Sequence, residues 1–276
     1  MQTPAYQHII STARQSVHIF DDSTLGEIHN FLEYSQHDKG GFKDRAGKPD
    51  LYYSLFGMWS ALALDEKESL NQLRVWIESR QDEKHQSVIE IVCLFLIKKS
   101  LGMKGSGVLI FKLMVLLAST RKNISPYYRL FIGLLLVDSL FPTLATLKWP
   151  GRNRLLKKAE RMTSSCTEAA AALVVLATSG GNTLALQEKI LTFFDVKTGF
   201  RAFHGKRDGD LLSTAAALFA LQYSGYDLRA IKPACLDFIG RNYTAGAFLP
   251  GDGDPETDIE YTFYGLLAAS SLYKFQ

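Results

Sequence analysis

Three stretches of the sequence repeat one pattern, and this repeat constrains the fold more than any other feature. They are GGFKDRAGKPDLYYSLFGMWSALAL (40–64), TGFRAFHGKRDGDLLSTAAALFALQ (198–222) and GAFLPGDGDPETDIEYTFYGLLAAS (246–270). Each has Gly or Ala before a Phe, then a polar loop, an Asp, a hydroxyl residue four positions later and a Gly or Ala seven positions later. Asp favours helix starts, because its carboxylate accepts backbone N–H bonds and faces the positive end of the helix dipole. The residues that follow are apolar nearly all round, which predicts a buried helix.

The spacing of these copies predicts a closed ring of helix pairs. Buried helices are expected to start near residues 50, 84, 126, 167, 210 and 258, about 40 residues apart. More amphipathic segments lie between them, such as 23–36, 66–81, 153–162, 182–194 and 227–242. An open solenoid has a similar period, but six pairs favour closure. We therefore predict an all-α protein, a single α/α toroid over residues 1–276, with about six inner and six outer helices (an α6-α6 barrel).

Composition narrows the function classes. The chain has 276 residues, a formal net charge of +3 and 21% charged residues. That balance predicts neither disorder nor a nucleic-acid partner. The three cysteines are far apart, and the N-terminus lacks the features of a signal peptide, so a cytoplasmic location is expected. The apolar stretches 107–119 and 129–141 are shorter than the roughly 20 residues of a membrane span; we expect buried helices there and leave a peripheral membrane contact open.

The repeat resembles the one shared by terpenoid cyclases and protein prenyltransferase beta subunits. The resemblance rests on Gly-Gly-Phe, a loop, Asp, and then a helix that starts with hydroxyl and aromatic residues, and it is clear in three of six sectors. It implies a barrel whose central cavity holds an isoprenoid chain, with polar chemistry where the inner helices begin. The same fold also serves noncatalytic domains that bind a lipid or a protein partner, so both an enzyme and a binding module are carried forward.

The zinc chemistry of the prenyltransferases does not transfer to this sequence. The resemblance implies an Asp and a Cys two residues later in one repeat, with a His three residues after the Asp of the next. The Cys positions hold Tyr52, Leu212 and Glu260, and the His positions hold Tyr53, Ser213 and Tyr261. A zinc site would have to be rebuilt, for instance from Asp210, His204 and Glu260, and we expect no metal site of this kind.

The carboxylates allow acid chemistry instead. Cyclases of the superfamily protonate an alkene or epoxide with an Asp of an Asp-x-Asp-Asp motif, which requires a protonated acid in an apolar cavity. The sequence offers DGDLLST and DGDPETD, in which Leu211 and Pro255 interrupt the motif. The candidate catalytic residues are Asp210 and Asp258, followed by Asp50, Asp208 and Asp254. In the excess of carboxylates around the third copy, Asp254 and Glu260 call most for a functional explanation.

Aromatic and basic residues near the helix starts are the candidate substrate contacts. Aromatic faces stabilise carbocations, and basic loops at helix N-termini suit a diphosphate, with Mg²⁺ as its companion. If the ring closes, the first, fifth and sixth sectors are consecutive and their loops converge. The alternative is that the aspartates only cap helices and the loop charges are only solvated. The candidate substrate-binding residues are Tyr52, Tyr53, Tyr261, Tyr264, Trp59, Lys206, Arg207 and His204.

Overall fold

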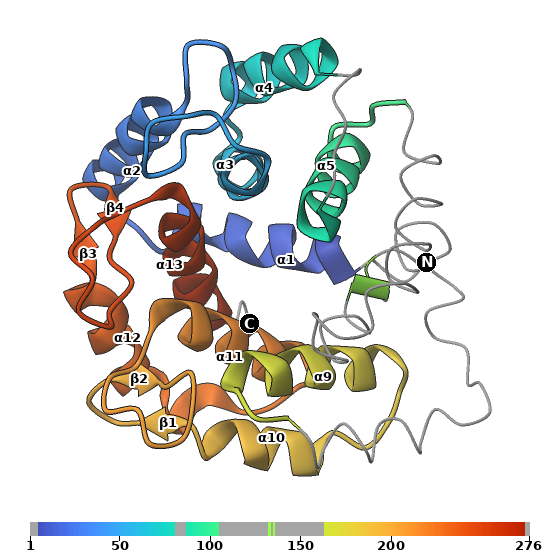
Figure 1. Ribbon diagram of the computed structural model, residues 1–276. Helices are drawn as coiled ribbons and strands as arrows, with labels where there is room; N and C mark the ends of the chain where they lie inside the picture. Colours follow the sequence, from blue (N-terminus) through green and yellow to red (C-terminus); the bar gives the residue numbers. More distant parts are fainter. Residues whose placement is uncertain (1–4, 81–86, 105–131, 134, 136–162, 274–276) are drawn as a thin grey trace.

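The computed structural model describes residues 5–80, 87–104, 132–133, 135 and 163–273, and within them the protein is mostly helical. Its inner helices are α3 (Leu51–Leu64), α5 (Val88–Ser100), α9 (Cys166–Thr178), α11 (Leu211–Tyr223) and α13 (Ile259–Ser271). They stand around a common centre (Figure 1), with α3 packed between α5 and α13 and α11 packed between α13 and α9. The predicted contact between the last sector and the first is therefore present.

The outer layer consists of more amphipathic helices. These are α2 (Asp22–Ser35), α4 (Lys67–Ser79), α10 (Leu184–Leu191) and α12 (Lys232–Arg241), all lying outside the inner helices in Figure 1. A 3-10 helix, η2 (Leu228–Ala230), precedes α12. The predicted inner helix near residue 126, the outer segment 153–162 and nearly all of the two apolar stretches lie outside the described residues. The full ring of six pairs is accordingly seen only in part.

Helix starts follow the sequence prediction closely, with one shift. Asp50, Asp210 and Asp258 are the N-caps of α3, α11 and α13, and each carboxylate accepts at least one backbone N–H of the first turn. Helix α9 begins at Cys166, next to the predicted position. Helix α5 begins at Val88 rather than near residue 84, because Ser87 and Glu90 form a capping box there.

The repeated phenylalanine has a specific partner in each of two copies. Phe42 lies against Gly57 of α3, and Phe248 lies against Gly265 of α13; a Cβ atom on either glycine would fall within 2.4 Å of the ring. The repeated hydroxyl binds the backbone of the motif phenylalanine in two copies. Ser54 Oγ accepts the N–H of Phe42 at 2.9 Å, and Thr214 Oγ1 accepts the N–H of Phe200 at 3.0 Å. The glycine at position seven thus makes room for the phenylalanine ring of its own repeat.

Short antiparallel pairings carry the chain from each outer helix to the motif. Two-residue strands form the hairpins β1 (Phe194–Asp195) with β2 (Gly199–Phe200) and β3 (Tyr243–Thr244) with β4 (Ala247–Phe248). In the first sector a single bridge joins Gln36 to Phe42. Every motif phenylalanine is therefore fixed on one side by the preceding outer sector and on the other by its inner helix.

The N-terminal helix α1 (Ala5–Ala13), with the 3-10 helix η1 (Arg14–His18) after it, crosses the end of the ring where the inner helices finish (Figure 1). Ser270 Oγ donates to the carbonyl of Ala13, and Arg14 Nη2 donates to the carbonyl of Leu62 at the end of α3. The sequence alone did not predict this helix. It makes that end a floor, so the open end is the one where the inner helices begin.

No helix among the described residues is long and apolar enough to cross a membrane. The three cysteines, Cys93, Cys166 and Cys235, are free and buried.

The fit of Phe42 on Gly57 leads to the first prediction. Gly57→Ala should lower the free energy of unfolding by about 1–3 kcal/mol, the usual cost of an extra methyl group in a packed interior. The matched control is Gly26→Ala in α2, where nothing lies within 4 Å of the added Cβ and the change should stabilise by about 0.5–1 kcal/mol. Urea unfolding of the two variants measures both effects, and equal stability of Gly57→Ala and the parent chain would contradict the packing described.

Candidate active site

An apolar cavity of about 290 Å³ lies at the centre of the ring. Side chains of all five described inner helices line it, and Ile9 of α1 contributes from the floor. The aromatic lining residues are Tyr52, Phe56, Trp59, Phe219, Phe263 and Tyr264. None of the described lining residues carries a charge. The volume is near the lower end of the range of about 300–1,000 Å³ found for small-molecule sites.

The aromatic rings of the cavity wall contact one another edge-on. Phe56 meets Tyr52 at a centroid distance of 5.0 Å, Tyr264 at 5.2 Å and Trp59 at 5.7 Å. These arrangements turn ring edges toward neighbouring faces and hold the wall in place. The wall is thus largely aromatic, a surface suited to a hydrocarbon chain or to a developing carbocation.

A carboxyl group lies at the rim of this cavity, between α13 and α3. The Tyr52 hydroxyl donates to Glu260 Oε1 at 2.5 Å. The Tyr264 side chain hydrogen-bonds to the same carboxyl group. Burial, and next the charge of Asp258, raise the pKa of Glu260, while burial and the charge of Glu260 raise the pKa of Tyr52. Tyr52 is therefore a neutral donor at physiological pH.

A second pocket of about 450 Å³, lined by both charged and apolar side chains, adjoins the cavity above the starts of α9 and α11; we call it the vestibule. Thr167 and Leu212 line both spaces, so the two are neighbours. The charged residues of the vestibule are Lys206, Asp208, Asp210 and Asp252, and Tyr261 also lines it. Burial raises the pKa of Asp210, partly offset by the N–H of Ser213, which donates to Asp210 Oδ1 at 2.7 Å.

The five candidate aspartates lie in three different places. Asp208 and Asp210 line the vestibule. Asp50 accepts the N–H groups of Tyr52 and Tyr53 at the start of α3, and Asp258 and Asp254 belong to an ion-pair cluster described next. None of the five is among the described residues that line the apolar cavity. Their catalytic roles remain predictions.

Arg45 joins the loop of the first repeat to that of the sixth. Its Nε donates to Asp258 Oδ2 at 2.8 Å, its Nη1 donates to Asp254 Oδ2 at 2.6 Å, and Glu256 lies 3.7 Å away. Asp258 is only 6% exposed, and its other oxygen accepts the N–H of Tyr261. The hydrogen bond from Arg45 lowers the pKa of Asp254. This Arg45 cluster fastens the ring at the contact between its two ends.

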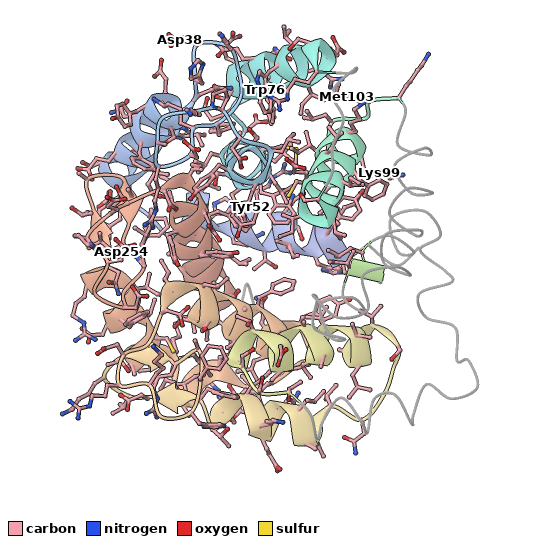
Figure 2. The ribbon with its side chains drawn as sticks, viewed as in Figure 1. Asp38, Tyr52, Trp76, Lys99, Met103 and Asp254 are labelled. Atoms are coloured by element: carbon pink, nitrogen blue, oxygen red, sulfur yellow. The ribbon has the colours of Figure 1, made fainter. Side chains whose placement is uncertain are left out.

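The candidate aromatic and basic residues that line a space are divided between the cavity and the vestibule. Tyr52, Tyr264 and Trp59 line the cavity, and Tyr261 and Lys206 line the vestibule. Figure 2 shows Tyr52 near the centre of the ring and Asp254 toward its periphery. Tyr53 lies edge-on to Tyr52 at 5.7 Å.

The remaining basic candidates do not join this group. His204 stacks on Phe193 at 4.1 Å, Arg207 is exposed, and neither is among the described residues that line the vestibule. Within the part of the chain that the structure describes, no three His, Cys, Asp or Glu side chains are close enough to hold a metal ion. The set of Asp210, His204 and Glu260 is accordingly not assembled.

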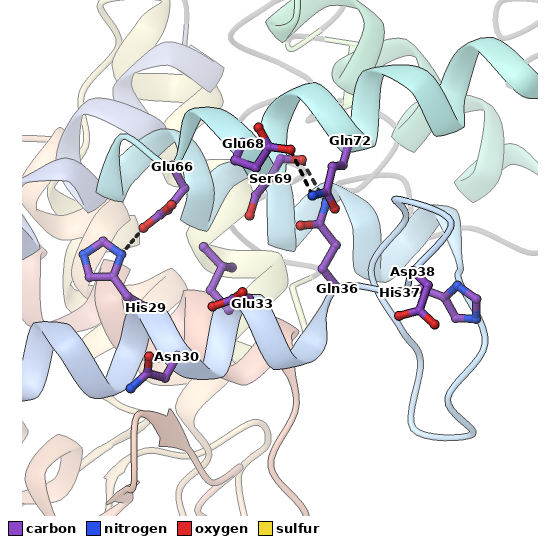
Figure 3. Close-up of a pocket in the computed structure, with 11 residues that line it drawn as sticks. His29, Asn30, Glu33, Gln36, His37, Asp38, Glu66, Glu68, Ser69 and Gln72 are labelled. Carbon is purple, nitrogen blue, oxygen red and sulfur yellow. Dashed lines mark hydrogen bonds and ion pairs between the residues drawn. The ribbon is translucent and has the colours of Figure 1, made fainter.

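A polar pocket of about 460 Å³ also lies outside the ring, between α2 and α4 (Figure 3). His29 contacts Glu66, Gln36 Nε2 donates to the carbonyl of Ser69 at 2.9 Å, and Gln72 Nε2 donates to Glu68 at 3.1 Å. The bonds of His29 and Gln36 connect the outer helix of the first sector to that of the next. We interpret this pocket as part of the outer scaffold.

Comparison with known protein families identifies the class. Residues 8–97 and 154–276 match the prenyltransferase alpha-alpha toroid domain, and the chain belongs to this family. Membership relates the chain to isoprenoid chemistry in general. A search among curated proteins found no significant match.

Sequence reasoning missed two features of the site. The sequence marks Glu260 for its excess charge and as a possible ligand of a rebuilt zinc site, but its pairing with Tyr52 depends on α13 and α3 being neighbours. Arg45 is not among the candidate residues, and its role depends on the same closure. The signal available in the sequence is that Arg45 and Glu260 each lie within a few residues of a repeated Asp.

The Arg45 cluster leads to the second prediction. Arg45→Met should lower the free energy of unfolding by about 1–3 kcal/mol, because buried Asp258 loses a charged hydrogen-bond donor. Arg229→Met is the control, since Arg229 pairs with Asp227 on the open surface, where 88% and 58% of the side chains are exposed, and should have little effect.

The pH dependence follows from Asp254. Its folded-state pKa lies below the ordinary 3.8, so its contribution is present above that value and is lost as the pH falls through the folded-state pKa. Thermal unfolding of Arg45→Met and the parent chain between pH 7 and pH 3 measures this. A stability difference that stays constant to pH 3 would contradict the pairing.

Proposed function

We propose that the protein is an enzyme of isoprenoid metabolism that binds an isoprenoid chain in the central cavity and acts through carboxyl groups rather than zinc. One observation carries the proposal: an apolar, aromatic cavity with no charged residue in its described lining adjoins a vestibule that contains Asp210. The isoprenoid chain would be buried among the aromatic rings of the cavity, and its reactive end would lie toward the vestibule. Family membership supports the choice of an isoprenoid ligand.

Asp210 is the proposed acid. Burial raises its pKa, which favours the protonated form that a general acid needs. Asp208 and Asp252 line the same vestibule and would tune it by their negative charge. Asp50, Asp254 and Asp258 would support the site by capping helices and binding Arg45.

The zinc reaction finds no support in these residues. Leu212 and Tyr261 line the vestibule at positions where the family resemblance implies a thiolate and an imidazole. Neither side chain is a zinc ligand of the usual kinds. The experiment below therefore also tests each diphosphate together with Mg²⁺.

A noncatalytic toroid that binds a lipid is the second candidate. It is favoured by the use of three candidate aspartates as helix N-caps. The two functions share the cavity and differ in whether a bound chain is converted.

Binding is tested with geranyl, farnesyl and geranylgeranyl chains, each as alcohol and as diphosphate, with and without Mg²⁺. Native mass spectrometry should detect a bound chain. Ala216→Phe, which places a ring in the cavity wall of α11, should weaken binding by about tenfold or more, as expected for lost apolar burial. Ala230→Phe, on the exposed surface of η2, is the control. If no chain binds, or if both variants bind like the parent, the cavity is not the site.

Catalysis is tested by product analysis of the same mixtures. Asp210→Asn should reduce product formation by about 100-fold while leaving chain binding nearly unchanged. Because the acid must be protonated, activity should fall as the pH rises through the pKa of Asp210, which lies above 3.8. Tight binding without any product would favour the noncatalytic function.

A further inference from the structure

The two hydrogen-bonded tyrosines place a carboxyl group where an apolar chain would end. Tyr52 and Tyr264 line the cavity, and both hydrogen-bond to Glu260. Phe56 contacts both tyrosine rings, at 5.0 and 5.2 Å. The rim therefore changes from hydrocarbon to hydrogen-bonding oxygen atoms over the width of one tyrosine ring.

The charges around the rim are unfavourable for an anion. Arg45, in the loop before α3, is held by Asp254 and Asp258 at 2.6 and 2.8 Å. The vestibule residues that the structure describes include three aspartates and one lysine, Lys206. A diphosphate placed at either opening would meet more carboxylates than cations, and like charges at short distance repel.

A hydroxyl group is complementary to the same rim. A carboxylate has two oxygens and about four acceptor positions, and Tyr52 and Tyr264 supply two donors, so acceptor capacity remains for a further donor. An alcohol can donate to a remaining acceptor position of the carboxylate, and its attached chain would enter the aromatic cavity directly. Burial makes such a bond stronger than it would be in water.

We propose that Glu260 and Tyr52 bind the polar end of the ligand as a hydroxyl group, so that the cavity selects an uncharged isoprenoid alcohol over the diphosphate of the same chain. This proposal rests on the proposed function and specifies its substrate class. Glu260 is the specificity-determining acceptor, and Tyr52 positions it. This role distinguishes Glu260, one of the extra carboxylates of the third repeat, from the repeated Asp258.

The experiment compares farnesol, farnesyl diphosphate and the C15 hydrocarbon farnesene on the full chain by titration calorimetry. The parent protein should bind farnesol most tightly. Glu260→Gln should weaken farnesol binding by about 10- to 100-fold, the range expected for one hydrogen bond to a charged group, and leave farnesene unchanged. The same variant should reduce or abolish the preference for alcohol over diphosphate.

A matched control exists on the outer face. Tyr243 donates to Glu27 at 2.5 Å in an exposed pair between β3 and α2, so Glu27→Gln removes an equivalent charge away from the cavity and should change none of the three affinities. Tyr52→Phe is the second test variant, which keeps the ring and removes the hydroxyl; it should weaken farnesol selectively. Circular dichroism confirms that each variant is folded.

The outcomes separate the two proposals. If no C15 compound binds, the proposed function fails. If the chains bind but the diphosphate binds as tightly as the alcohol, or if Glu260→Gln and Tyr52→Phe weaken all three ligands equally, the cavity function stands and the selection of an alcohol is overturned.

Discussion

The packing of a phenylalanine ring against a helical glycine is the contact on which the ring of helices depends. Phe42 on Gly57 and Phe248 on Gly265 tie a loop to the outside of an inner helix. The hydroxyl of Ser54 and the cap of Asp50 fix the same loop at the start of that helix. The first copy has all three of these local constraints, and the other two copies have two each, so contacts within each repeat orient its inner helix.

Once the inner helices stand side by side, the side chains that face inward line their common centre. In this chain that face is aromatic and uncharged, and α1 supplies a floor. The carboxylates gather at the other end, because the helices begin there and aspartate is the residue that caps them. The division into apolar cavity and acidic mouth is therefore a direct result of the repeat.

The sequence predicted the parts of this structure that depend on local interactions. The caps Asp50, Asp210 and Asp258 and the amphipathic outer helices are specified by residues within a few positions of each other. The pairs Arg45 with Asp258 and Tyr52 with Glu260 join residues more than 200 positions apart, and only the closure of the ring brings them together. Helix α1 is a third such case, since its amphipathic sequence does not say that it lies across the end of the ring.

The third repeat shows how a structural motif acquires additional chemistry. Asp258 does what every copy requires, capping its helix, and also accepts a bond from Arg45. Asp254 and Glu256 surround the same guanidinium, which leaves Asp252 to the vestibule and Glu260 to the rim. The five carboxylates of this segment thus face three different environments, and of the five only Asp252 and Glu260 lie beside a described space that a ligand can enter. Arg45 offsets part of the charge of the other three, so the negative charge that a ligand meets lies mainly at the openings, and this favours a neutral or donor group at the polar end of an apolar chain.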